Sequence, residues 1–64
     1  MISGLTIKQY LEERGIKQAY ISEKTGISKV ALNQILNDNR RMEVNEYATI
    51  CMALNLPLDY FRAS

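Results

Sequence analysis

The chain has 64 residues, so it holds one domain at most (1–64), with no room for a deep catalytic cleft between two lobes. It has no histidine and one cysteine, which excludes an intrachain disulfide and leaves a metal site without enough ligands. The net charge is only +1, a value that does not by itself predict nucleic-acid binding.

The first two helices are predicted from apolar spacing and end signals. We expect one helix from Thr6 or Ile7 to Arg14, with a capping box between Thr6 and Gln9 and with Gly15 just past its end. A second helix is expected over about 17–24, anchored by Ile21 and broken by Gly26.

A third helix is expected over about 28–37, with the Ser28 hydroxyl as its N-terminal cap. Only residues 25–27 separate it from the second helix, and a glycine-containing turn of this length is typical of a helix-turn-helix, here about 17–37. The Asn-Asp-Asn run at 37–39 then ends the helix, because Asn and Asp tolerate turn conformations.

The fourth helix is predicted from about Val44 to Leu54. Its apolar residues recur at spacings of three and four and form one stripe: Val44, Tyr47, Ile50, Cys51 and Leu54. Pro57 fits the first turn of a short fifth helix ending near Arg62, from which Leu58 and Phe61 would fold back onto the core. The sequence therefore predicts an all-α fold, a compact five-helix bundle.

The expected third helix carries an unusual polar stripe. Val30, Asn33, Gln34 and Asn37 lie at i, i+3, i+4 and i+7, bordered by Lys29, with no acidic residue between Lys24 and Asn37. Asn and Gln can bond adenine, Lys can bond guanine, and Val can contact a thymine methyl group. Taken alone, such a stripe is more often simply solvated.

The run IKQAYISEKTGISKVALNQILN, followed by YATICMALNL, resembles the lambda-repressor-like helix-turn-helix domains of phage repressors, Cro proteins and related (XRE-type) bacterial regulators. The resemblance covers about 7–61, and its motif falls on Gln18, Ile21, Ser22, Gly26, Ile27, Ser28 and Leu32. Three features depart from the family: Ser22 replaces an alanine, Asp38 replaces a common glycine, and Leu11 and Leu36 stand where many members pair Arg with Glu.

The resemblance implies that the helix over 28–37 reads the major groove of duplex DNA. We expect base contacts from Lys29, Val30, Asn33 and Gln34. The resemblance gives Gln18 a phosphate contact, and further phosphate contacts are expected from Lys17, Ser28, Asn37, Asn39, Arg40 and Arg41.

The predicted function is a transcriptional regulator, a repressor of phage, mobile-element or bacterial promoters. It would act as a homodimer on double-stranded DNA, with a dimer contact formed by Leu56, Leu58, Tyr60 and Phe61. No cofactor, metal, membrane or small-molecule ligand is expected, and no nucleophile–base pair suggests an enzyme.

The start of the chain lacks a signal-peptide pattern, no apolar run is long enough to span a bilayer, and the single cysteine fits the cytoplasm. The low net charge leaves one alternative function open. The same fold could be a protein-interaction module, an anti-repressor or antitoxin-like binder of another protein.

Overall fold

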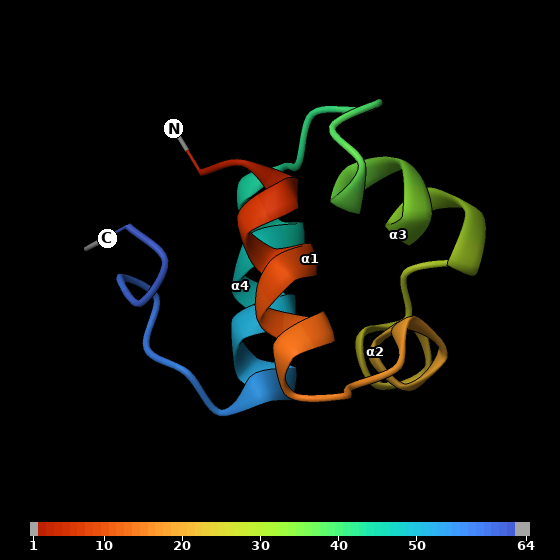
Figure 1. Cartoon of the computed structure of the whole chain (residues 1–64). Helices are drawn as coiled ribbons and strands as arrows, with labels where there is room; N and C mark the ends of the chain where they lie inside the picture. Colours follow the sequence, from red (N-terminus) through yellow and green to blue (C-terminus); the bar gives the residue numbers. More distant parts are fainter. Residues whose placement is uncertain (1, 63–64) are drawn as a thin grey trace.

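The computed structural model describes residues 2–62, which contain four helices and no strand: α1 (Gly4–Glu13), α2 (Gln18–Thr25), α3 (Lys29–Leu36) and α4 (Val44–Leu54). α1 lies in front of α4 in Figure 1, α2 and α3 lie to one side, and the segment after α4 lies to the other. α3 packs on α1, and α2 packs on both α3 and α4. The predicted all-α class is confirmed.

α1 begins two residues earlier than the expected Thr6. Ser3 is its N-terminal cap, and the Ser3 hydroxyl accepts a hydrogen bond from the Leu5 amide at 3.1 Å. The predicted Thr6–Gln9 capping box is wrong, because the Gln9 side chain instead donates to Glu13 Oε2, 3.3 Å away. Gly15 follows the helix at φ +67°, as its sequence position predicts.

α2 and α3 each begin within one residue of the expected position, and side-chain hydrogen bonds fix the turn between them. Gly26 ends α2 at φ +79°, and Ser28 caps α3 by accepting from the Ala31 amide at 3.2 Å. The Ser22 hydroxyl donates to the Ile27 carbonyl at 2.6 Å, so the serine that replaces the family's alanine ties α2 to the turn.

α4 has its predicted bounds, but its apolar stripe is shorter than expected. Ile50 and Cys51 are buried, and Tyr47 and Leu54 are half-buried. Val44 is 83% exposed, so the stripe does not continue as a buried face to the first residue of the helix. As the first residue of α4, Val44 has no further turn of helix beyond it to cover its side chain.

The predicted fifth helix is absent from the described residues. The segment 57–62 forms turns, in which the amides of Tyr60 and Arg62 each donate to a carbonyl three residues earlier at 3.1 Å. A segment this short gains too few hydrogen bonds to offset the cost of starting an α-helix. Phe61 is buried as expected, but Leu58 is 58% exposed and does not fold onto the core.

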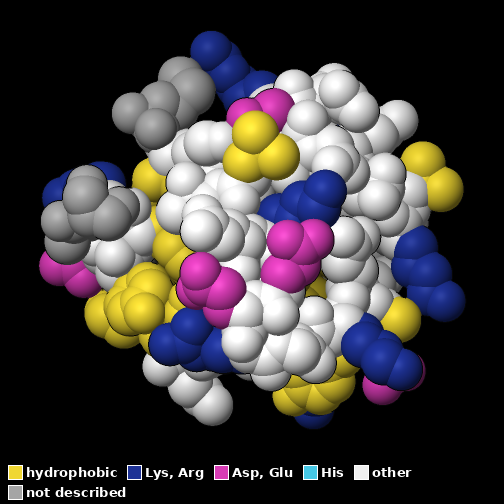
Figure 2. All heavy atoms as spheres, in the orientation of Figure 1, with side chains coloured by type: hydrophobic (Ala, Val, Ile, Leu, Met, Phe, Trp, Pro, Cys, Tyr) yellow, Lys and Arg dark blue, Asp and Glu magenta, His cyan; other side chains and the backbone are white. Residues whose placement is uncertain are grey.

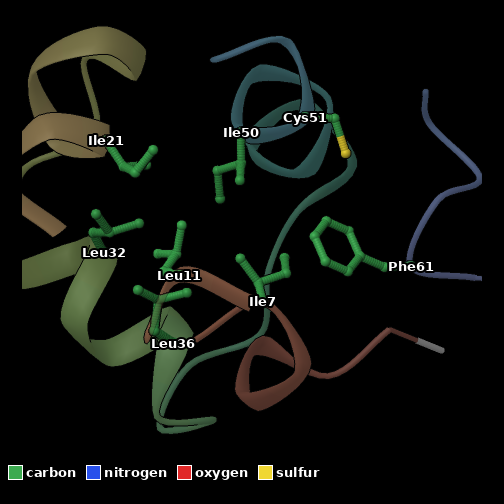
Figure 3. Close-up of a cluster of buried hydrophobic side chains, with 8 residues drawn as sticks. All are labelled: Ile7, Leu11, Ile21, Leu32, Leu36, Ile50, Cys51 and Phe61. Carbon is green, nitrogen blue, oxygen red and sulfur yellow. The ribbon is translucent and has the colours of Figure 1, made fainter. Parts of the chain in front are cut away.

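All four helices and the C-terminal segment contribute to one core (Figure 3). It consists of Ile7, Leu11, Ile21, Leu32, Leu36, Ile50, Cys51 and Phe61. Leu11 and Leu36 both lie in this cluster, so the two positions where the resemblance leads one to expect an ion pair are apolar and buried here. Tyr10, Tyr47 and Tyr60 pack edge-on against Phe61 and fix the C-terminal segment to the bundle.

Candidate nucleic-acid interface

α3 divides its residues between two faces. Leu32, Ile35 and Leu36 are fully buried, and the four residues predicted to read bases are all exposed: Lys29, Val30, Asn33 and Gln34. Val30 is 71% exposed, although burial of a valine is favourable. α3 lies at the edge of the molecule in Figure 1, so this exposed face is open to a large partner.

Asn37, at the end of the stripe, has both ends of its side chain bonded. Its Nδ2 donates to the Asn33 carbonyl at 2.8 Å, and its Oδ1 accepts from Lys8 Nζ at 2.7 Å. Asn37 therefore has less freedom to reach a phosphate than its position suggested. Lys8 was not singled out from the sequence, where nothing distinguishes it from other surface lysines.

The starts of α2 and α3 hold three further candidates. Lys17 is the N-terminal cap residue of α2 but makes no capping hydrogen bond with its side chain. Gln18, the first residue of α2, is half-buried. The Ser28 hydroxyl oxygen accepts a hydrogen bond from the Ala31 amide, which leaves the hydroxyl proton free to be donated.

The two neighbouring arginines of the α3–α4 loop have different surroundings. The Arg40 guanidinium binds Glu46 through two hydrogen bonds, of 2.9 and 2.5 Å, and also donates to the Arg41 carbonyl. Within residues 2–62, Arg41 has no carboxylate partner, and both Arg41 and Asn39 are exposed. The loop thus holds Arg40 in place and presents Arg41 to solvent.

The contact between Arg40 and Glu46 also shifts the pKa of both side chains. The hydrogen bond from Arg40, followed by one from the Glu43 amide, lowers the pKa of Glu46. The same hydrogen bond raises the pKa of Arg40. Glu46 thereby joins the loop to the first turn of α4, an arrangement that the sequence analysis missed.

The side chains expected at a dimer contact differ in exposure. Leu58 and Tyr60 are exposed, Leu56 is half-buried, and Phe61 is buried in the core. The Tyr47 hydroxyl donates to the Leu58 carbonyl, which holds the segment against α4. In Figure 1 this segment lies on the opposite side of α1 and α4 from α3.

Residues 2–62 contain no group of three His, Cys, Asp or Glu side chains that could hold a metal ion, and Cys51 is buried. None of the helices described is long and apolar enough to cross a membrane. On the face shown in Figure 2, basic and acidic side chains alternate without forming one large patch of either sign.

Comparison with known proteins identifies the same architecture. A family model described as helix-turn-helix matches residues 7–61, which include all of α2, α3 and α4. No curated protein and no solved structure matches the chain significantly.

Proposed function

We propose that this chain, which belongs to the lambda-repressor-like and Cro-like helix-turn-helix family of DNA-binding domains, is a sequence-specific transcriptional repressor. It would occupy a promoter on duplex DNA and block access to it, without carrying out chemistry. α3 would enter the major groove with its N-terminal half.

The exposed face of α3 is the observation that supports this proposal. It presents an ammonium group, two amides and a methyl-bearing side chain, and it has no acidic group to repel DNA: Lys29, Asn33, Gln34 and Val30. These groups match the donors, acceptors and thymine methyl groups at base edges. The buried Leu32, Ile35 and Leu36 hold the helix rigidly, so the four side chains keep their spacing.

Phosphate contacts would lie on both sides of α3. Lys17, Gln18 and Ser28 lie at the starts of α2 and α3, where backbone amides also point outward. On the far side, Arg41 and Asn39 are exposed. Because Arg40 is held by Glu46, we propose that Arg40 orients the loop and that Arg41 makes the phosphate contact.

We further propose that two copies bind a two-fold operator, with Leu58 and Tyr60 at the dimer contact. Two half-sites one turn of DNA apart are separated by about 34 Å. The domain measures 27 × 22 × 20 Å, so two copies in contact are large enough to place their α3 helices at this separation.

The low net charge favours one second candidate, a protein-interaction module that uses α3 or the C-terminal segment. Salt dependence separates the two functions. A DNA complex loses affinity steeply as salt rises, by a log–log slope of about 0.9 per neutralised phosphate. An apolar protein interface lacks this steep loss.

Selection from a random duplex-DNA library at about physiological salt tests the proposal, because phosphate contacts alone bind only weakly there. Lys29→Ala and Gln34→Ala would be compared with Asn45→Ala, which removes an exposed amide from α4 instead. We expect an enriched inverted repeat that changes with the two α3 variants and not with the control. Absence of any enriched sequence would overturn DNA reading, and a single enriched half-site would overturn only the dimer.

A further inference from the structure

A groove of about 540 Å³ lies between the end of α1, the start of α2 and the end of α4. These three segments lie at the bottom of Figure 1. It is lined by Tyr10, Gly15, Ile16, Lys17, Tyr20, Ala53 and Leu54. None of its residues belongs to α3, and α3 lies away from it in Figure 1. The DNA-reading proposal therefore leaves most of this groove without a role.

The apolar surface of the groove is held in place by the core. Ile16, Ala53 and Leu54 are partly buried and pack directly against the core, so they line the groove without being free to collapse into it. Tyr20 also lines the groove, and 48% of its surface is exposed. A partly exposed aromatic residue beside aliphatic side chains provides the kind of surface that holds an apolar side chain of a partner.

One cation lines this apolar surface, and two more lie against its tyrosine rings. Lys17 lines the groove, the Arg14 guanidinium lies 3.9 Å from the centre of the Tyr10 ring, and Lys24 Nζ lies 5.6 Å from the centre of the Tyr20 ring. The one salt bridge in residues 2–62 joins Arg40 to Glu46, so these three cations have no carboxylate partner there. At the lower edge of Figure 2, hydrophobic side chains lie between basic ones, with an acidic group nearby.

We propose that this groove binds a peptide segment of another protein, one that inserts an apolar side chain and carries carboxylates on either side of it. The apolar side chain would contact Ile16, Ala53 and Leu54, and the carboxylates would approach Arg14, Lys17 and Lys24. Lys17 in the groove and the two cations against its tyrosines favour an acidic partner over a basic one, although the exposed Glu13 and Glu23 are next to Arg14 and Lys24 in the sequence.

The positions of the cations also favour a peptide over a single-stranded nucleic acid. Bases bind aromatic side chains by stacking on a ring face. Here the Arg14 guanidinium covers one face of Tyr10, so that face is not open for stacking, and a base stacked on the same side of Tyr20 would have to displace Lys24. The groove instead offers aliphatic surface, which suits a leucine-like side chain.

Lys17 is the only residue that the groove shares with the proposed DNA contacts. A carboxylate in the groove and a DNA phosphate would therefore compete for Lys17, whereas the other groove residues lie outside the proposed DNA contacts. The groove proposal does not depend on DNA binding, and its test uses protein and peptide alone.

The test is a two-dimensional NMR titration of the ¹⁵N-labelled full chain with three capped peptides. All three carry the same central Leu-Phe pair, flanked by Glu, by Gln or by Lys. We expect the Glu peptide to shift the backbone amides of Ile16, Tyr20 and Leu54, the Gln peptide to bind more weakly and the Lys peptide not to bind. No shift with the Glu peptide at millimolar concentration, or equal shifts with the Glu and Lys peptides, would overturn the proposal.

Matched lysine variants locate the site. Lys24→Gln should weaken binding of the Glu peptide about two- to fivefold, as expected for one partly exposed charge pair. Lys29→Gln removes an exposed lysine from α3 and should leave peptide binding unchanged. Equal effects of the two variants would contradict this site.

Two further arms test the other possible occupants. If a short oligo-dT strand shifts the same amides and the Glu peptide does not, the groove binds nucleic acid and the peptide proposal fails. If those amides shift with protein concentration alone and the Glu peptide has no effect, the occupant is a second copy of the chain, and the proposal again fails. If neither oligo-dT nor protein concentration shifts these amides and the Glu peptide does shift them, the peptide proposal is supported.

Discussion

The backbone amide of Gly4 donates a hydrogen bond of 2.9 Å to the Asp38 carboxylate, which joins the start of α1 to the turn after α3. The Ser3 hydroxyl donates to the other carboxylate oxygen at 2.7 Å. A negative charge at this position also faces the positive end of the α1 dipole. Asp38 therefore caps a helix that lies 34 residues away in the sequence.

The first prediction separates the two roles of Asp38. The residue caps α1 and also adopts φ +59°, a conformation that strains most side chains. Asp38→Ala should cost about 2 kcal/mol, because it loses the cap and keeps the strain. Asp38→Gly should cost less, because glycine relieves the strain. Urea unfolding measures both, and equal losses would show that backbone strain has no role.

The second prediction concerns the close approach of α1 to α3. A Cβ atom added to Gly4 would lie 1.8 Å from the Ile35 carbonyl oxygen, so Gly4→Ala must push the two helices apart. We expect a loss of about 3 kcal/mol or more, a large part of the roughly 3–10 kcal/mol typical for a chain of this length. Thermal unfolding is the measurement.

Leu5→Ala is the matched control for this variant. Leu5 is the next residue of α1 and is half exposed, so its truncation should cost much less than Gly4→Ala. Alanine otherwise favours helix over glycine by about 1 kcal/mol. A Gly4→Ala protein as stable as the original would therefore contradict the close packing of α1 on α3.

The third prediction is a pH dependence of stability caused by Glu46. Folding lowers the pKa of Glu46 below its ordinary value of 4.5, chiefly through the Arg40 hydrogen bond. Its contribution is therefore complete above that value and disappears as the pH falls through the lowered pKa. The original protein should have a higher melting temperature than Glu46→Gln at pH 7, and the difference should shrink as the pH falls below 4.5 and disappear once Glu46 is protonated.

Glu23→Gln controls for the change in net charge, since Glu23 is an exposed carboxylate on α2. It should leave the melting temperature nearly unchanged at pH 7. A Glu46→Gln protein that melts like the original at every pH would show that the Arg40–Glu46 pair adds nothing to stability, as is true of many exposed pairs.

The fourth prediction tests the proposed dimer contact. Leu58→Asp should abolish dimers and leave the monomer fold intact, because Leu58 is 58% exposed and only its carbonyl is bonded to Tyr47. Met52→Asp, at a residue 75% exposed on α4, is the control. Sedimentation velocity with and without DNA distinguishes the outcomes. A monomer under all conditions, or an unaffected Leu58→Asp dimer, would contradict the proposal.

Most helix ends could be predicted because each depends on residues that are close together in the sequence. Gly15, Gly26 and Ser28 mark ends that depend on their own backbone conformation or on an amide three residues away. The exposed stripe of α3 was likewise predicted, since helical spacing alone separates Val30 from Leu32.

The missed features depend on contacts between distant residues. One hydrogen bond joins Gly4 to Asp38, 34 residues away, and another joins Lys8 to Asn37, 29 residues away. The periodicity of the sequence reveals neither contact. Arg40 was expected to be free for phosphate because its bond to Glu46 depends on the folded path of the loop. The fifth helix was predicted from Pro57 alone, without the length that a helix needs.

The most direct test of base reading by α3 pairs one side chain with one base. The affinities of the original protein and of Gln34→Ala would be measured for every single-base substitution in the selected operator. We predict that the original protein loses about 1–3 kcal/mol of binding free energy at each base that it contacts. Gln34→Ala should lose discrimination at one base position per half-site and keep it elsewhere. Unchanged discrimination at every position would contradict the account.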